Sequence, residues 1–247
     1  MNGPAIPARA TDVVEYGAVD SSKSPADGSL ANGNALKPGP RFAPAFRDDL
    51  AALLTWRRDV RHFRVEPIPE DIVAQLLATA QCAPSVGNSQ PWRFVRVRSA
   101  ALRGELARHV DREAERAGQA MGERREVYAA LKLHGLDRAP EILAVFCDGT
   151  TEVGGGLGAA TMPQTREWSV VLAIHTLWLA ARARGLGLGW VSIAEPDVVT
   201  RLLDVPPGWS FVALLCLGVP ERCDEVPELE RRGWQARLDW RRHVSER

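Results

Sequence analysis

The segment of residues 169–184 constrains the fold most, because as a helix it is apolar on almost every side. A surface helix needs only one apolar stripe, whereas a helix that is apolar all round must be covered on all of its faces. We therefore expect a central buried helix that also forms part of a subunit interface. The chain has 247 residues, 45% of them apolar, and can supply a sizeable core around that helix.

Hydrophobic periodicity predicts further helices and strands around this segment. Apolar residues at helical spacing over residues 46–54 predict a helix that carries Arg57 at its C-terminal end, and Pro69 begins a second helix. Residues 101–134 are rich in charge and have a helical pattern, so we expect a helical segment that acts as a mobile cover. Strands are expected at residues 92–97, 142–147, 189–193 and 211–216. The expected fold class is α+β, a layered fold with a central mixed or antiparallel sheet surrounded by helices.

Residues 1–44 differ in composition from the rest of the chain. They are rich in Pro, Gly and Ser and contain few large apolar side chains. Such a segment buries too little surface to offset the entropy lost on ordering, so we expect a flexible extension that the fold does not need. A partner-binding tail is the alternative, although no residue supports it specifically. Residues 45–247 are expected to form one domain.

Charge and cysteine content exclude several classes of protein. The chain has 31 basic and 31 acidic residues, which argues against nucleic acid or an anionic membrane as the principal partner. No signal sequence or long apolar run is present, so we expect a cytoplasmic protein. Cys82, Cys147 and Cys216 lie inside apolar runs, where reduced buried thiols are expected. Their spacing suits neither disulfides nor zinc, and no metal site is expected.

Residues 57–61, Arg-Arg-Asp-Val-Arg, predict a site for an anionic ligand. Three arginines near the end of an apolar segment suit the oxygens of a phosphate group. Asp59 would repel that phosphate, so it is expected to face another part of the same ligand. The polar loop at residues 83–92 can donate hydrogen bonds to the edge of a flat heterocycle. A solvated helix end with an ordinary ion pair remains the alternative.

A second pattern, the alternating glycines Gly185, Gly187 and Gly189, precedes an expected strand. The order differs from that of a dinucleotide-binding motif, in which the glycines follow a strand and open a helix. We expect these glycines to form a tight helix-to-strand turn and to allow the backbone to approach the ligand closely.

The arginine motif and the polar loop together resemble the nitroreductase-like flavoproteins. Within that family, the aspartate at position 59 makes the motif similar to that of the 5,6-dimethylbenzimidazole synthases, which fragment flavin. Ordinary flavin reductases usually carry a small hydroxyl residue at this position. The resemblance covers residues 45–240 and continues through residues 131–133, 161–163, 175–185, 189–192, 227–230 and 233–234. It implies a nitroreductase-like layered fold that is dimeric.

The resemblance also implies the residues of an FMN site. Arg57, Arg58 and Arg61 would hold the flavin phosphate and the pyrimidine edge of the ring. Asp59 would lie near the ribityl chain and exchange protons, and Ser192 would lie against the ring, so these two are the expected catalytic residues. The remaining expected ligands of the flavin are Val60, Ser85, Asn88, Gln90, Leu133 and Arg237. Each of these roles has an alternative. Ser192 could cap the end of a strand, the loop of Ser85, Asn88 and Gln90 could be a plain turn, and Arg237 could be an ordinary surface charge.

The implied activity is an O2-dependent fragmentation of reduced FMN. The products would be 5,6-dimethylbenzimidazole, the lower ligand of cobalamin, and erythrose 4-phosphate. The implied partners are a second copy of the chain, with flavin sites at the interface, and a separate flavin reductase, through which NAD(P)H acts only indirectly. An NAD(P)H-dependent FMN nitro- or quinone reductase is the alternative enzyme, and a flavin carrier without catalysis is the non-enzyme alternative.

Overall fold

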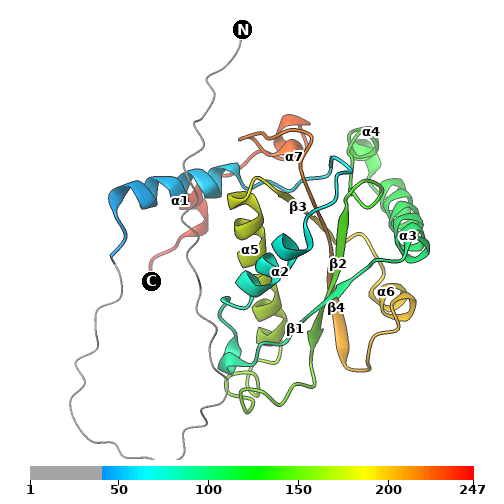
Figure 1. Ribbon diagram of the computed structural model, residues 1–247. Coiled ribbons are helices and arrows are strands. Elements are labelled where there is room, and N and C mark those ends of the chain that lie inside the picture. The colour runs from blue at the N-terminus through cyan, green and yellow to red at the C-terminus, as the bar shows by residue number, and fades with distance from the viewer. Residues whose placement is uncertain (1–40) are drawn as a thin grey trace, which may run out of the picture. The chain divides into compact units, whose positions relative to one another are not determined.

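A four-stranded antiparallel sheet lies at the centre of the structure, a computed structural model that describes residues 41–247 (Figure 1). Its strands are β1 (Trp92–Arg96), β2 (Glu141–Asp148), β3 (Gly187–Val191) and β4 (Trp209–Gly218), in the order β1-β2-β4-β3. All eight residues of β2 are buried, as expected for a strand that is covered on both faces. The sheet therefore forms the middle layer of the fold.

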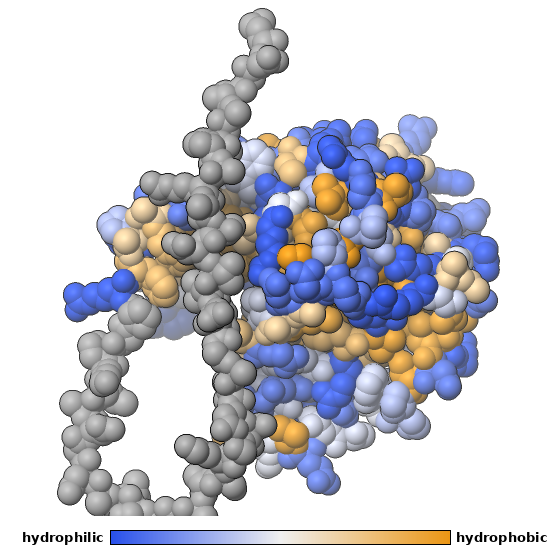
Figure 2. Space-filling view, in the orientation of Figure 1, coloured by the Kyte–Doolittle hydropathy of each residue, from blue (hydrophilic) through white to orange (hydrophobic). Residues whose placement is uncertain are grey.

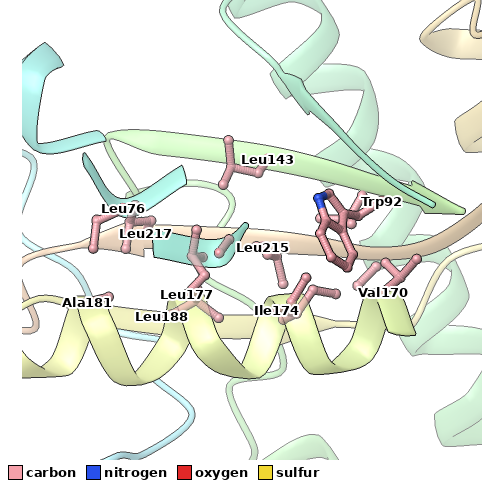
Figure 3. Close-up of a cluster of buried hydrophobic side chains, with 14 of the residues drawn as sticks. Leu76, Trp92, Leu143, Val170, Ile174, Leu177, Ala181, Leu188, Leu215 and Leu217 are labelled. Atoms are coloured by element: carbon pink, nitrogen blue, oxygen red, sulfur yellow. The ribbon is translucent and has the colours of Figure 1, made fainter. Parts of the chain in front are cut away.

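Helices cover both faces of this sheet (Figure 1). On one face, α2 (Glu70–Ala80) and α5 (Thr165–Ala183) pack over alternate strand residues such as Leu215 and form the core cluster drawn in Figure 3. On the other face, α3 (Ala100–Gln119) and α6 (Pro196–Leu202) pack over residues such as Leu214. The predicted α+β layered fold is confirmed, and within residues 41–247 the strand pairs of its sheet are antiparallel.

The remaining elements are short apart from one helix. That helix is α1 (Pro44–Trp56); the others are η1 (Val86–Asn88), η2 (Gly122–Arg124), α4 (Arg125–Ala129), α7 (Glu228–Arg231) and η3 (Trp240–His243). Residues 42–247 form one compact unit, and the predicted extension of residues 1–44 falls almost entirely outside the described residues. No helix within residues 41–247 has the length and apolar character needed to cross a membrane.

Two predictions about local structure were wrong. The strand expected at residues 189–193 is β3, which begins two residues earlier, where Gly187 pairs with Gly218, and ends at Val191, before Ser192. Cys82 is exposed, because it follows the end of α2 in a turn rather than continuing an apolar element. The buried free thiols expected at Cys147 and Cys216 are confirmed.

Helix α5 is only partly covered within one chain. Residues such as Ile174 and Leu177 are fully buried against the sheet, but Trp168, Val171 and Leu172 are 52%, 42% and 45% exposed. The expectation of a helix buried on all sides is therefore not met by one chain alone. No residue of α1 is buried within the described part of the chain, although Phe46, Leu50 and Leu54 are apolar, and Figure 2 shows apolar colour along this helix.

The segment that follows α1 docks along the open edge of β3. Asp59 forms a parallel bridge with Leu188, and the Val60 N–H donates a hydrogen bond to the Leu188 carbonyl oxygen at 3.0 Å. Gly189 makes this contact possible, because a Cβ atom there would lie 2.0 Å from the carbonyl oxygen of Val60. A Cβ at Gly187 would lie 2.7 Å from the Val60 side chain.

The role predicted for the glycines is confirmed in part. Gly185 has a φ of 75° and forms the expected turn between α5 and β3. At Gly187 and Gly189 the space that a Cβ would fill is taken by Val60 of the same chain, and the close approach to the ligand stays a prediction. The two strand glycines therefore act on the site indirectly, by letting residues 57–61 lie against the sheet.

Replacing Gly189 by alanine should destabilise the protein. The added Cβ meets backbone that cannot move without breaking the bridge to β3, and overpacking of this kind costs about 1–3 kcal/mol. Urea-induced unfolding measures the loss. The control is Gly104→Ala on α3, where the nearest atom to the new Cβ is the flexible end of Arg108 at 3.5 Å, and where stability should rise by about 0.5–1 kcal/mol. A Gly189→Ala protein as stable as its parent would contradict this account of the docking.

Candidate functional site

The predicted arginine cluster lies where α1 ends. The helix stops at Trp56, and the main chain becomes extended at Arg57, whose N–H donates to the Leu53 carbonyl at 2.9 Å. The side chains that follow line a cavity of about 210 Å³. Four arginines and two carboxylates leave this lining with a formal charge of +2, which favours an anionic ligand. Its residues are Arg57, Arg58, Asp59, Arg61, Pro227, Glu228, Leu229 and Arg237.

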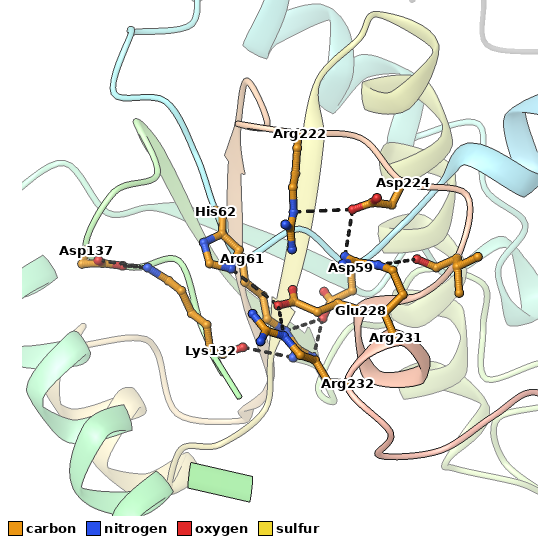
Figure 4. Close-up of polar contacts among 11 residues, drawn as sticks. Asp59, Arg61, His62, Lys132, Asp137, Arg222, Asp224, Glu228, Arg231 and Arg232 are labelled. Carbon is orange, nitrogen blue, oxygen red and sulfur yellow. Dashed lines mark hydrogen bonds and ion pairs between the residues drawn. The ribbon is translucent and has the colours of Figure 1, made fainter. Parts of the chain in front are cut away.

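Asp59 uses both of its carboxylate oxygens in contacts with the protein. Oδ1 accepts a hydrogen bond from the Trp190 N–H of β3 at 2.8 Å, and Oδ2 lies 3.0 Å from Nε and 2.9 Å from Nη2 of Arg61 (Figure 4). Burial raises the pKa of Asp59, while Arg61, the Trp190 amide and Arg57 act in the opposite direction. Such a carboxylate is held in one orientation and takes up a proton more readily than a solvated one, which suits proton exchange.

Arg61 connects Asp59 to the segment expected to cover the site. Its Nη1 donates to the carbonyl oxygen of Lys132 at 3.0 Å, and Lys132 lies between α4 and β2 (Figure 4). The Arg61 side chain is only 13% exposed. One guanidinium group thus fixes a carboxylate on one side and the main chain of the helical segment on the other.

Arg57, Arg58 and Arg237 form the side of the cavity that suits a phosphate. Arg58 donates to the carbonyl oxygens of Glu225 and Arg57, and Arg57 lies over the Trp178 ring at 4.8 Å. Among the described residues, none of the three arginines forms an ion pair like that of Arg61 with Asp59. Burial and the charge of Arg237 lower the pKa of Arg57 and of Arg58. A bound anion would relieve this mutual repulsion, so the residues fit a phosphate group.

Two residues of the site were missed by the sequence analysis. Glu228 lines the cavity, and its Oε1 lies 3.6 Å from Nε2 of His62 and 3.7 Å from Nε of Arg232. Its only signal was membership of the matched segment 227–230. Trp178 donates from Nε1 to the Arg58 carbonyl at 3.2 Å. It was hidden within the apolar segment of α5, where a tryptophan looks like an ordinary core residue.

Three predicted site residues, Ser192, Val60 and Leu133, do not line this cavity. Ser192 is exposed and follows β3 two residues after Trp190, the strand residue that binds Asp59. Val60 points its side chain at Gly187 and contributes its main chain to the docking on β3. Leu133 lines a second cavity, next to α3 and α4. The roles predicted for these three residues remain predictions.

The loop that carries Ser85, Asn88 and Gln90 is not brought to the arginine cluster within one chain. Ser85 accepts a hydrogen bond from the Gln90 N–H at 3.1 Å, and the Val86 N–H donates to Ser169 near the start of α5 at 3.0 Å. The arginines instead contact Trp178 of the same helix. Nine residues of helix separate the two contacts, or about 13 Å along its axis.

Comparison with known proteins shows which proteins the chain is related to. Residues 54–219 match the model of the nitroreductase family. A 5,6-dimethylbenzimidazole synthase of Rhodospirillum rubrum is 61% identical over 204 residues, which cover 82% of this chain and 96% of that protein. One of Rhodobacter capsulatus is 52% identical over 204 residues, which cover 81% and 99% respectively. The resemblance inferred from the motifs is confirmed.

A solved structure supports the same relationship. Oxidized iodotyrosine deiodinase bound to FMN and 3-iodo-L-tyrosine matches with a TM-score of 0.61 and 28% identity, over 71% of this chain and 91% of that chain. A match of this quality shows that the two chains share a fold. Since the family model spans most of the chain and close relatives align along it, the chain belongs to the nitroreductase family.

Proposed function

We propose that this protein is a 5,6-dimethylbenzimidazole synthase, which fragments reduced FMN with O2 to 5,6-dimethylbenzimidazole and erythrose 4-phosphate. The product would serve as the lower ligand of cobalamin. The observation that carries the proposal is Asp59, held by the Trp190 amide and Arg61 on the wall of an arginine-lined cavity. The activity named for relatives at 61% and 52% identity supports it.

The charges and shape of the site support FMN as the ligand. The cavity of about 210 Å³ adjoins another of about 390 Å³, and the two share Arg58, Pro227 and Arg237 in their linings. We assign the flavin phosphate to Arg57, Arg58 and Arg237, because none of the three forms an ion pair with a carboxylate among the described residues, as Arg61 does. The ribityl chain and ring would then extend past Asp59 toward the end of β3, where Ser192 follows.

In this proposal the protein positions the substrate and handles protons. Bound reduced flavin supplies the electrons for the reaction with O2 and the carbon atoms of the products. Asp59 accepts and returns protons as bonds of the ribityl chain break, and its raised pKa suits this exchange. Arg61 keeps Asp59 in place and binds the main-chain carbonyl of Lys132. The second contact holds the covering segment over the site, and the covered site excludes water.

We also propose that two copies of the chain associate. The apolar side chains of α1 and of the outer face of α5 are exposed in one chain, and large exposed apolar patches mark interaction surfaces. A second copy could bring its Ser85, Asn88 and Gln90 to the flavin, which one chain does not do. The reduced FMN would come from a separate flavin reductase, in the cytoplasm.

The proposed activity is tested by incubating the protein with reduced FMN in air and analysing the products. We expect dimethylbenzimidazole from the parent protein. Asp59→Asn keeps the shape of the side chain but removes its basicity, so it should still bind reduced FMN while forming product about 100- to 10,000-fold more slowly. Ser192→Gly should also bind, because one hydroxyl hydrogen bond contributes about 0.5–1.5 kcal/mol, but its product yield should fall.

Other outcomes of the same experiment would contradict the proposal. Intact flavin that is recycled while NADH is consumed would identify a nitro- or quinone reductase instead. Bound flavin without any reaction would identify a carrier. If Asp59→Asn and Ser192→Gly made product at the parent rate, their catalytic roles would be wrong. If both variants failed to bind FMN, they would be binding residues only.

The phosphate assignment predicts a difference between FMN and riboflavin, which lacks the phosphate. Arg237→Gln should weaken FMN binding by about 10- to 150-fold, as for the loss of a charge-assisted hydrogen bond, and leave riboflavin binding unchanged. Arg241→Gln is the matched control, because Arg241 pairs with Asp239 and is 72% exposed outside the cavity. Equal losses for both flavins in Arg237→Gln would show that Arg237 does not bind the phosphate.

The association of two chains predicts the effect of a charge on α5. Leu172→Glu would bury a carboxylate in the proposed interface and should produce a monomer that sediments at half the parent mass. Val127→Glu, at an exposed apolar position on α4, should leave the parent mass unchanged. Sedimentation equilibrium at micromolar concentration decides the matter, and a parent protein that is itself monomeric would contradict the proposal.

A further inference from the structure

The matched residues Gly233 and Trp234 have no part in the site described so far. They follow α7, where Gly233 has a φ of 73°, a conformation that favours glycine. The Gly233 N–H donates to the Glu230 carbonyl oxygen at 2.9 Å, and the Trp234 N–H donates to that of Leu229 at 2.8 Å. This pair of hydrogen bonds closes the helix and fixes the direction in which Trp234 leaves it. Trp234 does not line the arginine-lined cavity.

Trp234 is attached to the covering segment, residues 101–134, through two side chains. The guanidinium carbon of Arg124 lies 3.6 Å from the centroid of the Trp234 ring, and Arg124 also donates to the Trp234 carbonyl oxygen. The centroid of the Tyr128 ring lies 6.1 Å from that of Trp234, and Tyr128 is itself buried beside Gly118 of α3. A cation over an aromatic ring and a tilted aromatic pair are both favourable contacts. Trp234 is therefore held at its ring and at its main chain.

The position of Arg237 depends on this attachment. Arg237 lies three residues after Trp234 and lines the arginine-lined cavity, where its charge lowers the pKa of Arg57 and of Arg58. Within the described part of the chain, no main-chain group of residues 235–238 forms a hydrogen bond with another main-chain group. Trp234 is thus the last fixed point of the chain before Arg237.

The covering segment contacts both sides of the arginine-lined cavity. The Lys132 carbonyl oxygen accepts a hydrogen bond from Arg61, the partner of Asp59. Earlier in the same segment, Arg124 contacts Trp234. One segment therefore holds the carboxylate side of the cavity through Arg61 and the C-terminal side through Trp234.

We propose that Trp234 is a positioning residue, which fixes Arg237 for the flavin phosphate and thereby sets a preference for FMN over riboflavin. This inference rests on the phosphate assignment made under the proposed function. A ligand binds more weakly when the conformation that it needs is only partly populated. Without the contacts of Trp234, Arg237 would occupy many positions, and FMN would have to order the segment as it binds. Riboflavin has no phosphate and would not be affected.

Equilibrium dialysis of oxidised FMN and of riboflavin against the full-length protein tests the inference without any turnover. Trp234→Leu should weaken FMN binding about 5- to 50-fold, the factor expected for losing a cation–π contact together with an aromatic pair, and leave riboflavin binding unchanged. Trp234→Phe keeps an aromatic ring and should retain much of the preference. Trp240→Leu is the matched control, because Trp240 belongs to the same C-terminal segment, is 63% exposed and lies outside the cavity.

A double variant tests whether Trp234 acts through Arg237. Arg237→Gln already lacks the cation that Trp234 positions, so adding Trp234→Leu should weaken FMN binding no further. Arg124→Gln is a second way to loosen the contact if the tryptophan variant folds poorly. It replaces an exposed residue, removes the cation from the ring and should lower the preference for FMN in the same direction.

Three results would overturn the inference. They are FMN binding at the parent affinity in Trp234→Leu, equal losses of FMN and riboflavin in that variant, and a further loss when Trp234→Leu is added to Arg237→Gln. A parent protein that forms dimethylbenzimidazole, with a Trp234→Leu variant that keeps the full preference for FMN, would lose this inference and keep the proposed function. Loss of the preference in Trp234→Leu, with no product from the parent, would do the opposite.

Discussion

The contact on which the site depends is the docking of residues 57–61 against β3. Gly189 allows the Val60 carbonyl to approach to a distance that no side chain would permit, and the Val60 N–H binds Leu188 in return. This register places Asp59 opposite the main chain of β3, where its carboxylate accepts the Trp190 N–H. The same docking directs the neighbouring arginines toward the cavity. A small change in the strand would thus move the acid and the cations of the site together.

The second constraint is the balance of charge around the cavity. Arg61 neutralises Asp59, while burial and the repulsion among Arg57, Arg58 and Arg237 lower the pKa of Arg57 and of Arg58. Removing Arg61 would leave a half-buried carboxylate without its partner, which is far more costly than loss of a surface ion pair. The excess positive charge remains for the ligand. A site of this kind is stable enough to fold and becomes more favourable when an anion binds.

The sequence predicted the layers and most elements, because hydrophobic periodicity and proline positions are local signals. The helix that delivers Arg57 and the strand that became the fully buried β2 are examples. The contact of Gly189 with Val60 could not be predicted, since it joins residues far apart in the chain. For the same reason the two-residue shift of β3, set by pairing with β4, was missed. Glu228 and Trp178 had no signal beyond their place in matched segments, and the exposed face of α5 depends on what covers it.

The most direct test of the central claim is a crystal structure of the protein with reduced FMN, determined without oxygen. The account predicts the phosphate within hydrogen-bond distance of Arg57, Arg58 and Arg237, and the ribityl chain beside Asp59. The hydrogen bond from the Trp190 amide to Asp59 should persist in the complex. A phosphate bound away from these arginines, or an Asp59 carboxylate that turns from the flavin, would contradict the account.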